Sequence, residues 1–315
     1  MTENQLNLAL NFDAIFGKSK RYICKALSKK EEGDLDEYQL WASLALELLG
    51  KAALSKIHPC LIADPNHFQS IFAAAGKNIS TDIKTITANT LFDRLRHVIP
   101  HFDEPVRKFC AGISLRRNAE LHSGETPFCA MRLEVWEPRY WHASQVILHG
   151  MGASLGDWLD VSQADVSRRI IKFAMEAKCQ AVSIRVNLAK EVFETRTQAD
   201  RNKAIEESKH LNAYHYKNLF TFSEDHRWAC VCPSCNGKAY MAGLKTDEEV
   251  IDQHDDDPDG AWEEVETHYS AEQLHCPVCD LFLDGYYEIE CAKLDIYHSE
   301  IKEREMEYVQ EYGNE

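Results

Sequence analysis

Apolar residues recur at helical spacing along most of the chain. The clearest stretch is residues 36–57, where Leu40, Leu44 and Leu48 follow one another at intervals of four and charged residues occupy the opposite face. Such a stripe is typical of an amphipathic helix that packs against a core. Pro59 ends the pattern, because the residue before a proline avoids helical geometry. We therefore predict a helix over residues 36–57.

Two weaker helical patterns follow. A short apolar segment at residues 68–72 comes after a turn, and a longer segment ends just before Pro100. Asn78 and Ser80 precede the longer segment, and both side chains can accept a hydrogen bond from a free backbone N–H at a helix start. The pattern predicts two helices, with these polar residues as candidates for the N-cap of the second.

The next predicted helix has a clear beginning and a clear end. Asp103 is a candidate N-cap, and Pro105 falls in the first turn, where proline is tolerated. Ser123 and Gly124 form a stop signal. Between these ends, apolar residues recur at helical spacing, namely Val106, Cys110, Ile113 and Leu121.

The remaining pattern changes at Trp228. Before this residue, apolar spacing predicts helices over residues 141–159 and, with many charges, over residues 163–211. From Trp228 onward, cysteines, short strands and acidic stretches replace the helical spacing. A charged segment at residues 293–311 predicts a final helix. The fold class we predict is mainly α, with a small β module near the C-terminus.

Four cysteines in the β module have the spacing of a zinc ribbon. Cys232 and Cys235 form one Cys-Pro-x-Cys turn, and Cys276 and Cys279 form a second. Two residues between cysteines allow one tight turn to present both thiolates, and two such turns supply the four ligands of tetrahedral zinc. A fully ligated ion has no open position for a substrate. We therefore predict a structural Zn²⁺ rather than a catalytic one.

Cys230 and His275 adjoin the two cysteine turns. Cys230 could replace a cysteine of the first turn as a zinc ligand, and a place on the strand that leads into that turn is the alternative. His275 could likewise be a ligand or a neighbour of the site. We expect both residues to lie outside the ligand set.

A long acidic insertion, residues 236–275, separates the two cysteine turns. Acidic residues from Asp255 onward, together with Gly260 and Glu266, match the spacing of an EF-hand calcium loop. The same pattern arises readily in a strongly acidic stretch, and Pro258 is unusual in such a loop. We expect a solvated acidic loop, with a Ca²⁺ site from Asp255 to Glu266 as the alternative.

Composition limits the location and the partners of the protein. No apolar run approaches the roughly 20 residues of a membrane helix, and the start of the chain lacks the basic and apolar regions of a signal peptide. We therefore expect a cytoplasmic protein whose 11 cysteines are thiols or metal ligands rather than disulfides. The net charge of −16 disfavours general coating of nucleic acid. Six basic and two acidic residues from Arg94 to Arg117 still allow a local basic site.

Arg117 and His122 are the candidate catalytic pair. Arg117 falls near the centre of the apolar stripe of its helix, and burial of an unpaired guanidinium is unfavourable. The position therefore implies either a buried carboxylate partner or an interface at which an anion binds. His122 lies in the last helical turn, where the partial negative charge of the helix terminus favours the protonated imidazole. A histidine in that setting suits general acid–base catalysis.

These two side chains are not expected to point the same way. Each residue rotates a helix by about 100°, so five residues place His122 about 140° from Arg117. Either the helix loosens near Ser123 and Gly124, or a two-fold dimer brings the arginine of one chain beside the histidine of the other. We favour the dimer.

The segment from Arg117 to His122, RNAELH, resembles the RxxxxH motif of the HEPN superfamily in its Arg-Asn-x-x-x-His form. The run LWASLALELL at residues 40–49, with KAAL after it, is similar to the opening helix of several HEPN domains. The resemblance covers about residues 35–160. The chain then divides into a HEPN-like helical domain at 1–160, a helical extension at 161–225, a zinc ribbon with an acidic insertion at 226–290 and a charged C-terminal helix at 291–315.

The resemblance implies a metal-independent endoribonuclease that acts as a homodimer with a composite active site. Arg117 would bind the scissile phosphate, His122 would act as general acid or base in attack by the RNA 2′-hydroxyl, and Asn118 would help to orient the pair. The products would be a 2′,3′-cyclic phosphate and a 5′-hydroxyl, and DNA would not be cut. The superfamily serves in toxin–antitoxin, antiviral defence and CRISPR systems, which implies a trigger or inhibitor protein as a partner.

The residues alone leave a second interpretation open. His122 could be a surface histidine at a helix end, and Arg117 could pair with a core acid such as Glu47 or Glu120. The chain would then be a catalytically silent dimeric adaptor that binds RNA or protein through its zinc ribbon. A DNA-binding ribbon regulator is disfavoured by the acidity of the C-terminal part.

Overall fold

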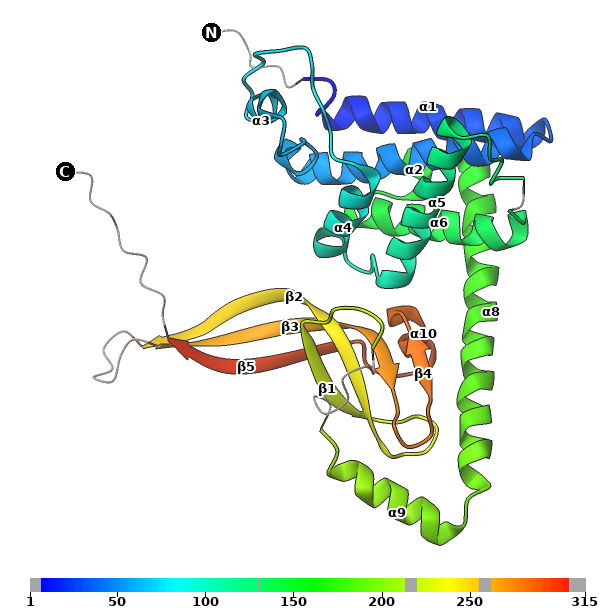
Figure 1. Cartoon of the computed structure of the whole chain (residues 1–315), viewed down its shortest axis with the longest axis vertical. Helices are drawn as coiled ribbons and strands as arrows, with labels where there is room; N and C mark the ends of the chain where they lie inside the picture. The colour runs from blue at the N-terminus through cyan, green and yellow to red at the C-terminus, as the bar shows by residue number, and fades with distance from the viewer. Residues whose placement is uncertain (1–6, 130, 213–219, 255–261, 306–315) are drawn as a thin grey trace. The chain divides into compact units, whose positions relative to one another are not determined.

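The computed structural model describes residues 7–129, 131–212, 220–254 and 262–305, and the chain divides into two compact units (Figure 1). The first unit, Met1–Ala177, is helical throughout its regular elements, and the second, Lys178–Glu315, contains an antiparallel sheet. The predicted fold class is confirmed at this level. No helix in the described part of the chain is long and apolar enough to cross a membrane.

The first unit contains seven helices and the beginning of an eighth within its described residues. They are α1 (Phe12–Glu31), α2 (Leu35–Ile57), α3 (Phe68–Ala74), α4 (Ala88–Val98), α5 (Glu104–His122), α6 (Leu133–Gly150), α7 (Leu155–Trp158) and α8 (Val161–Glu194), with a 3₁₀ turn at Pro59–Leu61.

Helix α2 is the centre of this unit, because it contacts α1, α4, α5 and α6. Asp34 caps its start by accepting a hydrogen bond from the Glu37 N–H at 3.1 Å, and the helix ends before Pro59 as predicted. Alanines such as Ala42 and Ala45 are fully buried and allow neighbouring helices to approach. Helix α1 lies along α2 (Figure 1), so the two form a helical hairpin.

A buried polar network joins α1, α2 and α6. The Glu137 carboxylate accepts hydrogen bonds from the Tyr38 hydroxyl, at 2.8 Å, and from the Lys30 ammonium. Burial, followed by the neighbouring Glu137 charge, raises the pKa of Tyr38 well above its ordinary value, so its hydroxyl remains a donor. Because a buried carboxylate without partners would be unfavourable, these contacts fix how the three helices pack.

Two helix boundaries in the first unit differ from the prediction. Helix α4 begins after Thr87, whose hydroxyl accepts from the Thr90 N–H at 3.4 Å, and neither Asn78 nor Ser80 is its N-cap. The chain between them forms no helix, and Thr85 makes an isolated β-bridge with Ala63. The helix expected over 141–159 is α6, which begins earlier and ends at Gly150, followed by the separate α7. Gly152, just after α6, has a left-handed backbone, which ends the helix there.

The expected helix over residues 163–211 is two helices. α8 ends at Glu194, and α9 (Gln198–Lys209) begins after Thr197. The Thr197 hydroxyl accepts from the Asp200 N–H at 3.2 Å and donates to the Asp200 carboxylate at 2.7 Å. This local capping satisfies the N–H groups of a new helix start and ends the continuous helix.

The second unit contains an antiparallel sheet in the order β1-β2-β3, with β4 and β5 both on the far side of β3. The strands are β1 (His226–Val231), β2 (Lys238–His254), β3 (Trp262–His275), β4 (Phe282–Asp284) and β5 (Tyr297–Glu305), and α10 (Tyr286–Cys291) lies between the last two.

The acidic insertion forms most of a long β-hairpin rather than a solvated loop. β2 and β3 pair along nearly their whole length, and bulges interrupt the register at three places. An EF-hand needs flanking helices, whereas strands flank this segment, and Glu266 lies within β3 opposite Glu249. The EF-hand interpretation is therefore wrong in its flanks, and residues 255–261 of the proposed loop lie outside the described residues.

The charged C-terminal helix expected at 291–315 is wrong for the described residues. Tyr297–Glu305 form β5, which pairs with the outer edge of β3. Arg304 of β5 binds Glu263 at 2.6 Å and Glu248 at 2.8 Å. These contacts to β3 and to β2 beyond it are absent in an isolated helix and favour the extended conformation. Residues 306–315 lie outside the described residues.

Aromatic rings from three strands stack on one face of this sheet. His226 and Trp228 come from β1, Tyr269 from β3 and His298 from β5, with ring centroids 4.6 Å apart for His226 and Tyr269 and 4.9 Å for Trp228 and His298. β2 lies between β1 and β3 and has Gly243 beside these rings, where a Cβ would lie 2.1 Å from the Ser270 carbonyl oxygen. The missing side chain lets the rings pack closely, which anchors β5 to the sheet.

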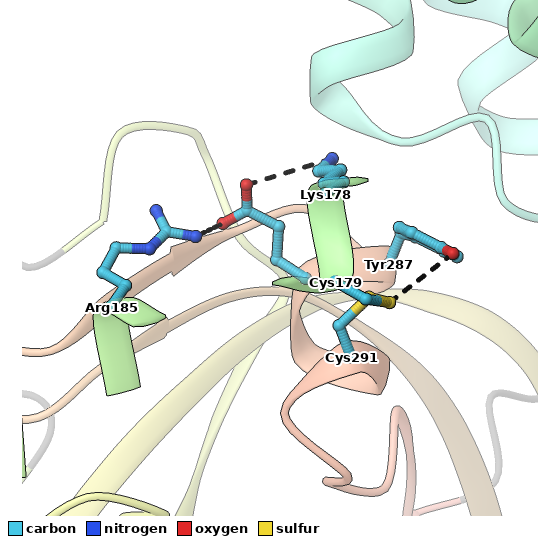
Figure 2. The surroundings of a disulfide bond; sticks show 6 residues. Lys178, Cys179, Arg185, Tyr287 and Cys291 are labelled. Atoms are coloured by element: carbon cyan, nitrogen blue, oxygen red, sulfur yellow. Dashed lines mark hydrogen bonds and ion pairs between the residues drawn. A yellow bond between two sulfur atoms is a disulfide. The ribbon is translucent and has the colours of Figure 1, made fainter. Parts of the chain in front are cut away.

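One disulfide joins α8 to α10, contrary to the expectation that all cysteines are thiols or metal ligands. Cys179 and Cys291 are bonded, and the Tyr287 hydroxyl lies 3.6 Å from the Cys179 Sγ (Figure 2). Beside the disulfide, Glu288 binds Arg185 at 2.5 Å and Lys178 at 3.9 Å. These contacts attach the second half of α8 to the sheet unit.

Candidate functional site

Helix α5 presents the RxxxxH segment as its last two turns. Asp103 caps its start, accepting from the Val106 N–H at 2.9 Å, and the helix ends at His122, both as predicted. The buried face of α5 includes Val106, Cys110 and Ile113. Arg117 lies on the same face at helical spacing, as predicted, and this face packs against α2.

Arg117 is paired with a carboxylate of α2. Its Nη2 donates to Glu47 Oε2 at 2.6 Å, and Lys51 binds the other oxygen of the same carboxylate at 2.9 Å. The Arg117 and Glu47 side chains are only 15% and 14% exposed. Burial alone would raise the pKa of Glu47, but the ion pairs with Lys51 and Arg117 outweigh it and lower the pKa below its usual value. The Glu47 carboxylate therefore stays ionised at neutral pH.

Part of the Arg117 guanidinium is left without a partner. Its Nε is buried and has no hydrogen-bond partner among the described residues, and the same holds for Oε2 of Glu120 one turn further along α5. Of the two acids named as partners for Arg117, Glu47 forms the ion pair, and no ion pair with Glu120 is found among the described residues. An unsatisfied buried donor is unusual in a native protein, and a bound anion is one explanation for it.

His122 and Asn118 are both exposed to solvent. Within the described chain, neither side chain makes a hydrogen bond or an ion pair that would fix it. Arg117 faces α2 while His122 faces away from the core, so one chain does not bring the two together. Helix α5 remains regular up to His122, and the Ser123 N–H donates to the Ala119 carbonyl at 2.9 Å, the ordinary helical pattern. The helix therefore does not loosen before its end.

The two cysteine turns of the second unit have the same backbone design. In each turn, the backbone N–H of the residue after the second cysteine donates to the carbonyl of the first cysteine. Asn236 donates to Cys232 at 3.1 Å, and Asp280 donates to Cys276 at 2.8 Å. Asn236 and Asp280 are both left-handed, with φ of 59°. Asn and Asp tolerate this conformation better than other residues with a side chain, so the residue after each cysteine pair was a second sequence signal for the turns.

The four predicted cysteines come together in one cluster. Their sulfur atoms all lie within 4.8 Å of one another, and the Cys232–Cys279 and Cys235–Cys276 Sγ distances are both 3.6 Å. A tetrahedral ion with Zn–S bonds of about 2.3 Å needs sulfurs about 3.8 Å apart. The geometry therefore fits a metal ion of the zinc type and excludes disulfides among these four.

The surroundings of the cluster favour thiolates. The Ser234 and Gly237 N–H groups point at the Cys232 and Cys235 sulfurs, each at 3.4 Å. Hydrogen bonds among the four sulfurs lower the pKa of Cys232 and Cys279 and raise the pKa of Cys235 and Cys276, so two of the thiols are inclined to ionise before a cation binds. Since thiolates are the metal-binding form of cysteine, the site is prepared for a cation.

Cys230 and His275 lie outside the ligand cluster, as predicted. Cys230 is on β1 opposite Ala239 and packs against the core of the sheet unit, and burial raises the pKa of its thiol to about 12. His275 ends β3, and its Nε2 lies 2.9 Å from the Asp280 carboxylate. Neither residue belongs to the group of metal-ligating atoms found among the described residues.

Comparisons with known proteins give no further assignment. No family model, no curated protein and no solved structure matches the chain.

Proposed function

We propose that the protein is a metal-independent endoribonuclease of HEPN type. One observation carries the proposal: Arg117 is held by Glu47 in a nearly buried position with its Nε unsatisfied, and the exposed His122 ends the same helix. A fixed cation with a free donor and a solvent-facing imidazole are the two groups that phosphodiester cleavage by a 2′-hydroxyl requires.

The roles of the residues follow from their chemistry. Arg117 would donate to the scissile phosphate and stabilise the charge that develops on its oxygens. His122 would take the proton of the 2′-hydroxyl or protonate the departing 5′-oxygen, and Asn118 would help to orient the pair of Arg117 and His122. The bond from phosphorus to the 5′-oxygen breaks as the bond to the 2′-oxygen forms. The products are a 2′,3′-cyclic phosphate and a 5′-hydroxyl, without a catalytic metal.

We propose a homodimer because one chain directs Arg117 and His122 to different sides of α5. A second copy would place its His122 beside Arg117 and complete a composite site. The four-cysteine cluster would hold a structural Zn²⁺, since all four ligand positions are filled by protein. A cytoplasmic antiviral effector or toxin, kept inactive by an inhibitor or awaiting a trigger, is the setting we propose for this activity.

Cleavage of total cellular RNA in EDTA tests the proposal. The purified protein is compared with His122→Ala and with His149→Ala, a matched control because His149 is also exposed in the last turn of a helix, α6. We expect wild type and His149→Ala to cut equally and leave 2′,3′-cyclic ends, and His122→Ala to lose at least about 100-fold in rate. Equal cutting by all three proteins would assign the activity elsewhere.

A silent dimeric adaptor is the second candidate, and the Arg117–Glu47 ion pair favours it. An arginine that only joins α5 to α2 has no need of a phosphate. The adaptor would bind RNA or protein through its zinc ribbon and cut nothing under any condition. Absence of cleavage, together with specific capture of RNA by the wild-type protein, would support the adaptor over the enzyme.

A further inference from the structure

Strand β5 leaves one edge of the sheet open. It pairs with β3 along all nine of its residues, Tyr297–Glu305, on the side of β3 away from β2 (Figure 1). No strand in the described part of the chain pairs with the outer side of β5. An open edge presents backbone N–H and C=O groups that can pair with a strand of another chain, so this edge is a candidate interaction surface.

The edge of β5 is regular, unlike the other long edge of the same sheet. β1 pairs with β2 only as far as Gly243, and beyond this residue two bulges interrupt the register of β2, one at Thr246 and one at Ile251. Bulges twist an edge strand and oppose its pairing with another chain. The register of β5 with β3 runs without a break from Tyr297 to Glu305. Of the two edges, β5 therefore has the backbone that suits a partner strand.

We propose that the partner is a second copy of the chain, whose β5 pairs antiparallel with this one. A two-fold axis perpendicular to the sheet brings the same strand of two copies together and closes the contact. Residues directly opposite each other in an antiparallel pair lie on one face of the sheet, so the centre of such a dimer is one residue opposite itself. All nine residues of β5 pair when that central residue is Ile301.

The charges of β5 select the same centre. With Ile301 opposite itself, Glu300 of each copy lies opposite Lys302 of the other. A centre shifted by one residue would place Glu300 opposite Glu300 or Lys302 opposite Lys302. Like charges directly opposite each other destabilise a sheet, whereas opposite charges stabilise it. The charged residues at 303–305 lie opposite the formally neutral residues at 297–299, so the strand is complementary to itself in one register.

Ile301 also gains from the central position. Its side chain is 58% exposed, and the residue directly opposite it on β3 is Glu266, which offers no apolar side chain. Opposite Ile301 of a second copy, the two β-branched side chains would cover each other and remove apolar surface from water. Self-pairing therefore explains an exposed isoleucine between two residues of opposite charge.

The dimer contact is separate from the RxxxxH pair. β5 belongs to the sheet unit, whereas Arg117 and His122 belong to the first unit. The inference therefore goes beyond the proposed ribonuclease activity and does not depend on it. Two paired strands of nine residues form a small interface, so we expect the contact to form at protein concentrations on the order of 10 µM or above.

Cysteine cross-linking of the full-length protein tests the inference without RNA. The exposed Cys24, Cys60 and Cys129 are first replaced by serine. Ile301→Cys is then compared with Ser299→Cys, a matched control because Ser299 is also exposed and lies on the same face of β5. Directly opposite residues have Cβ atoms about 4.5–5.5 Å apart, which allows a disulfide, whereas position 299 lies opposite position 303. We expect Ile301→Cys to cross-link at least about tenfold faster under mild oxidation, with the joined peptides identified by mass spectrometry.

Two charge variants of the Ile301→Cys protein test the register. Glu300→Lys places a lysine opposite Lys302, and Lys302→Glu places a glutamate opposite Glu300, so each variant alone should cross-link about tenfold more slowly. An equal mixture of the two variants restores opposite charges across the contact and should regain the original rate as heterodimers. Lys190→Glu, at an exposed lysine of α8, should leave the rate unchanged.

The mixture is the decisive arm. Glu300 also contacts Lys302 at 2.6 Å and His226 at 3.4 Å within its own chain, so a single variant could act through its own fold, and thermal melting checks each one. The mixture repairs no contact within either chain, so a regained rate can come only from pairing between copies. Equal cross-linking of Ile301→Cys and Ser299→Cys, or a mixture no faster than its components, would overturn the inference.

Discussion

At the scale of single residues, the Arg117–Glu47 contact is compatible with both interpretations of Arg117, as a phosphate-binding residue and as a purely structural one. The carboxylate accepts from Nη2 of Arg117 and from Lys51, so it holds the guanidinium in one orientation. An arginine has five N–H donors in a planar fork, and its Nε remains unpaired here. A phosphate could use donors that Glu47 does not, whereas a purely structural pair needs only the charge.

Arg117→Lys separates these roles. A lysine keeps the positive charge beside Glu47 but has no planar fork for a phosphate. We expect the free energy of unfolding to fall by no more than about 1–2 kcal/mol, while RNA cleavage falls by about 100-fold or more. Urea unfolding and a cleavage assay measure the two effects. Arg21→Lys, at an exposed arginine of α1, is the control. A lysine variant that cuts at the wild-type rate would leave Arg117 a structural role.

At the scale of elements, the sequence predicted best where local chemistry fixes the structure. Asp103 and Pro59 set helix boundaries through backbone rules that act within a few residues, and the cysteine spacing predicted the four-cysteine cluster. The candidate pair was also found from the sequence, and Glu47 was named as an alternative partner for Arg117. The choice of Glu47 needed the packing of α5 on α2, which local pattern does not encode.

Elements that depend on distant partners were missed or misassigned. No helix was predicted at α1, whose buried residues, such as Ile15 and Ile23, alternate with many lysines and lie against α2 only after folding. The charges of β5 suggested a helix, but the free edge of β3 and the acids that bind Arg304 favour a strand. Tertiary pairing overrides local preference in β5, whereas α1 has a local start signal in Asn11, whose side chain accepts from the Ala14 N–H.

Loss of one cluster cysteine should release the metal and loosen the sheet unit. Cys276→Ser removes one of four soft ligands at a site where binding and folding are coupled. We expect wild type to contain one zinc per chain and Cys276→Ser to contain much less and to unfold at a lower temperature. Metal analysis by mass spectrometry and thermal melting check this. Cys230→Ser, outside the cluster, should keep its zinc. Equal metal loss in both variants would mean that the four-cysteine cluster is not the metal site.

At the scale of the whole molecule, charge divides between the two units. Met1–Ala177 contains 21 acidic and 21 basic residues, so the net charge of −16 comes entirely from Lys178–Glu315. The acidic unit would repel a polyanion, whereas the neutral unit contains the RxxxxH pair. We therefore expect RNA to contact the first unit, through few phosphates and with a shallow dependence on salt.

A composite site across a dimer predicts that two inactive variants restore activity when they form a heterodimer. If the arginine of one chain works with the histidine of the other, Arg117→Lys and His122→Ala should each be inactive alone. A heterodimer of the two variants contains one site with both mutations and one site with a native arginine and a native histidine. Co-expression with two different affinity tags, followed by purification through both, isolates this heterodimer.

The heterodimer should cleave RNA at about half the rate of the wild-type dimer, since one of its two sites is intact. A site built within a single chain gives the opposite result, because every chain of the heterodimer carries one mutation and no site is complete. The same preparation with Arg117→Lys and His122→Ala combined in one chain and wild type in the other separates the cases further. A composite arrangement leaves no native pair in that dimer, whereas a single-chain site leaves the wild-type chain active.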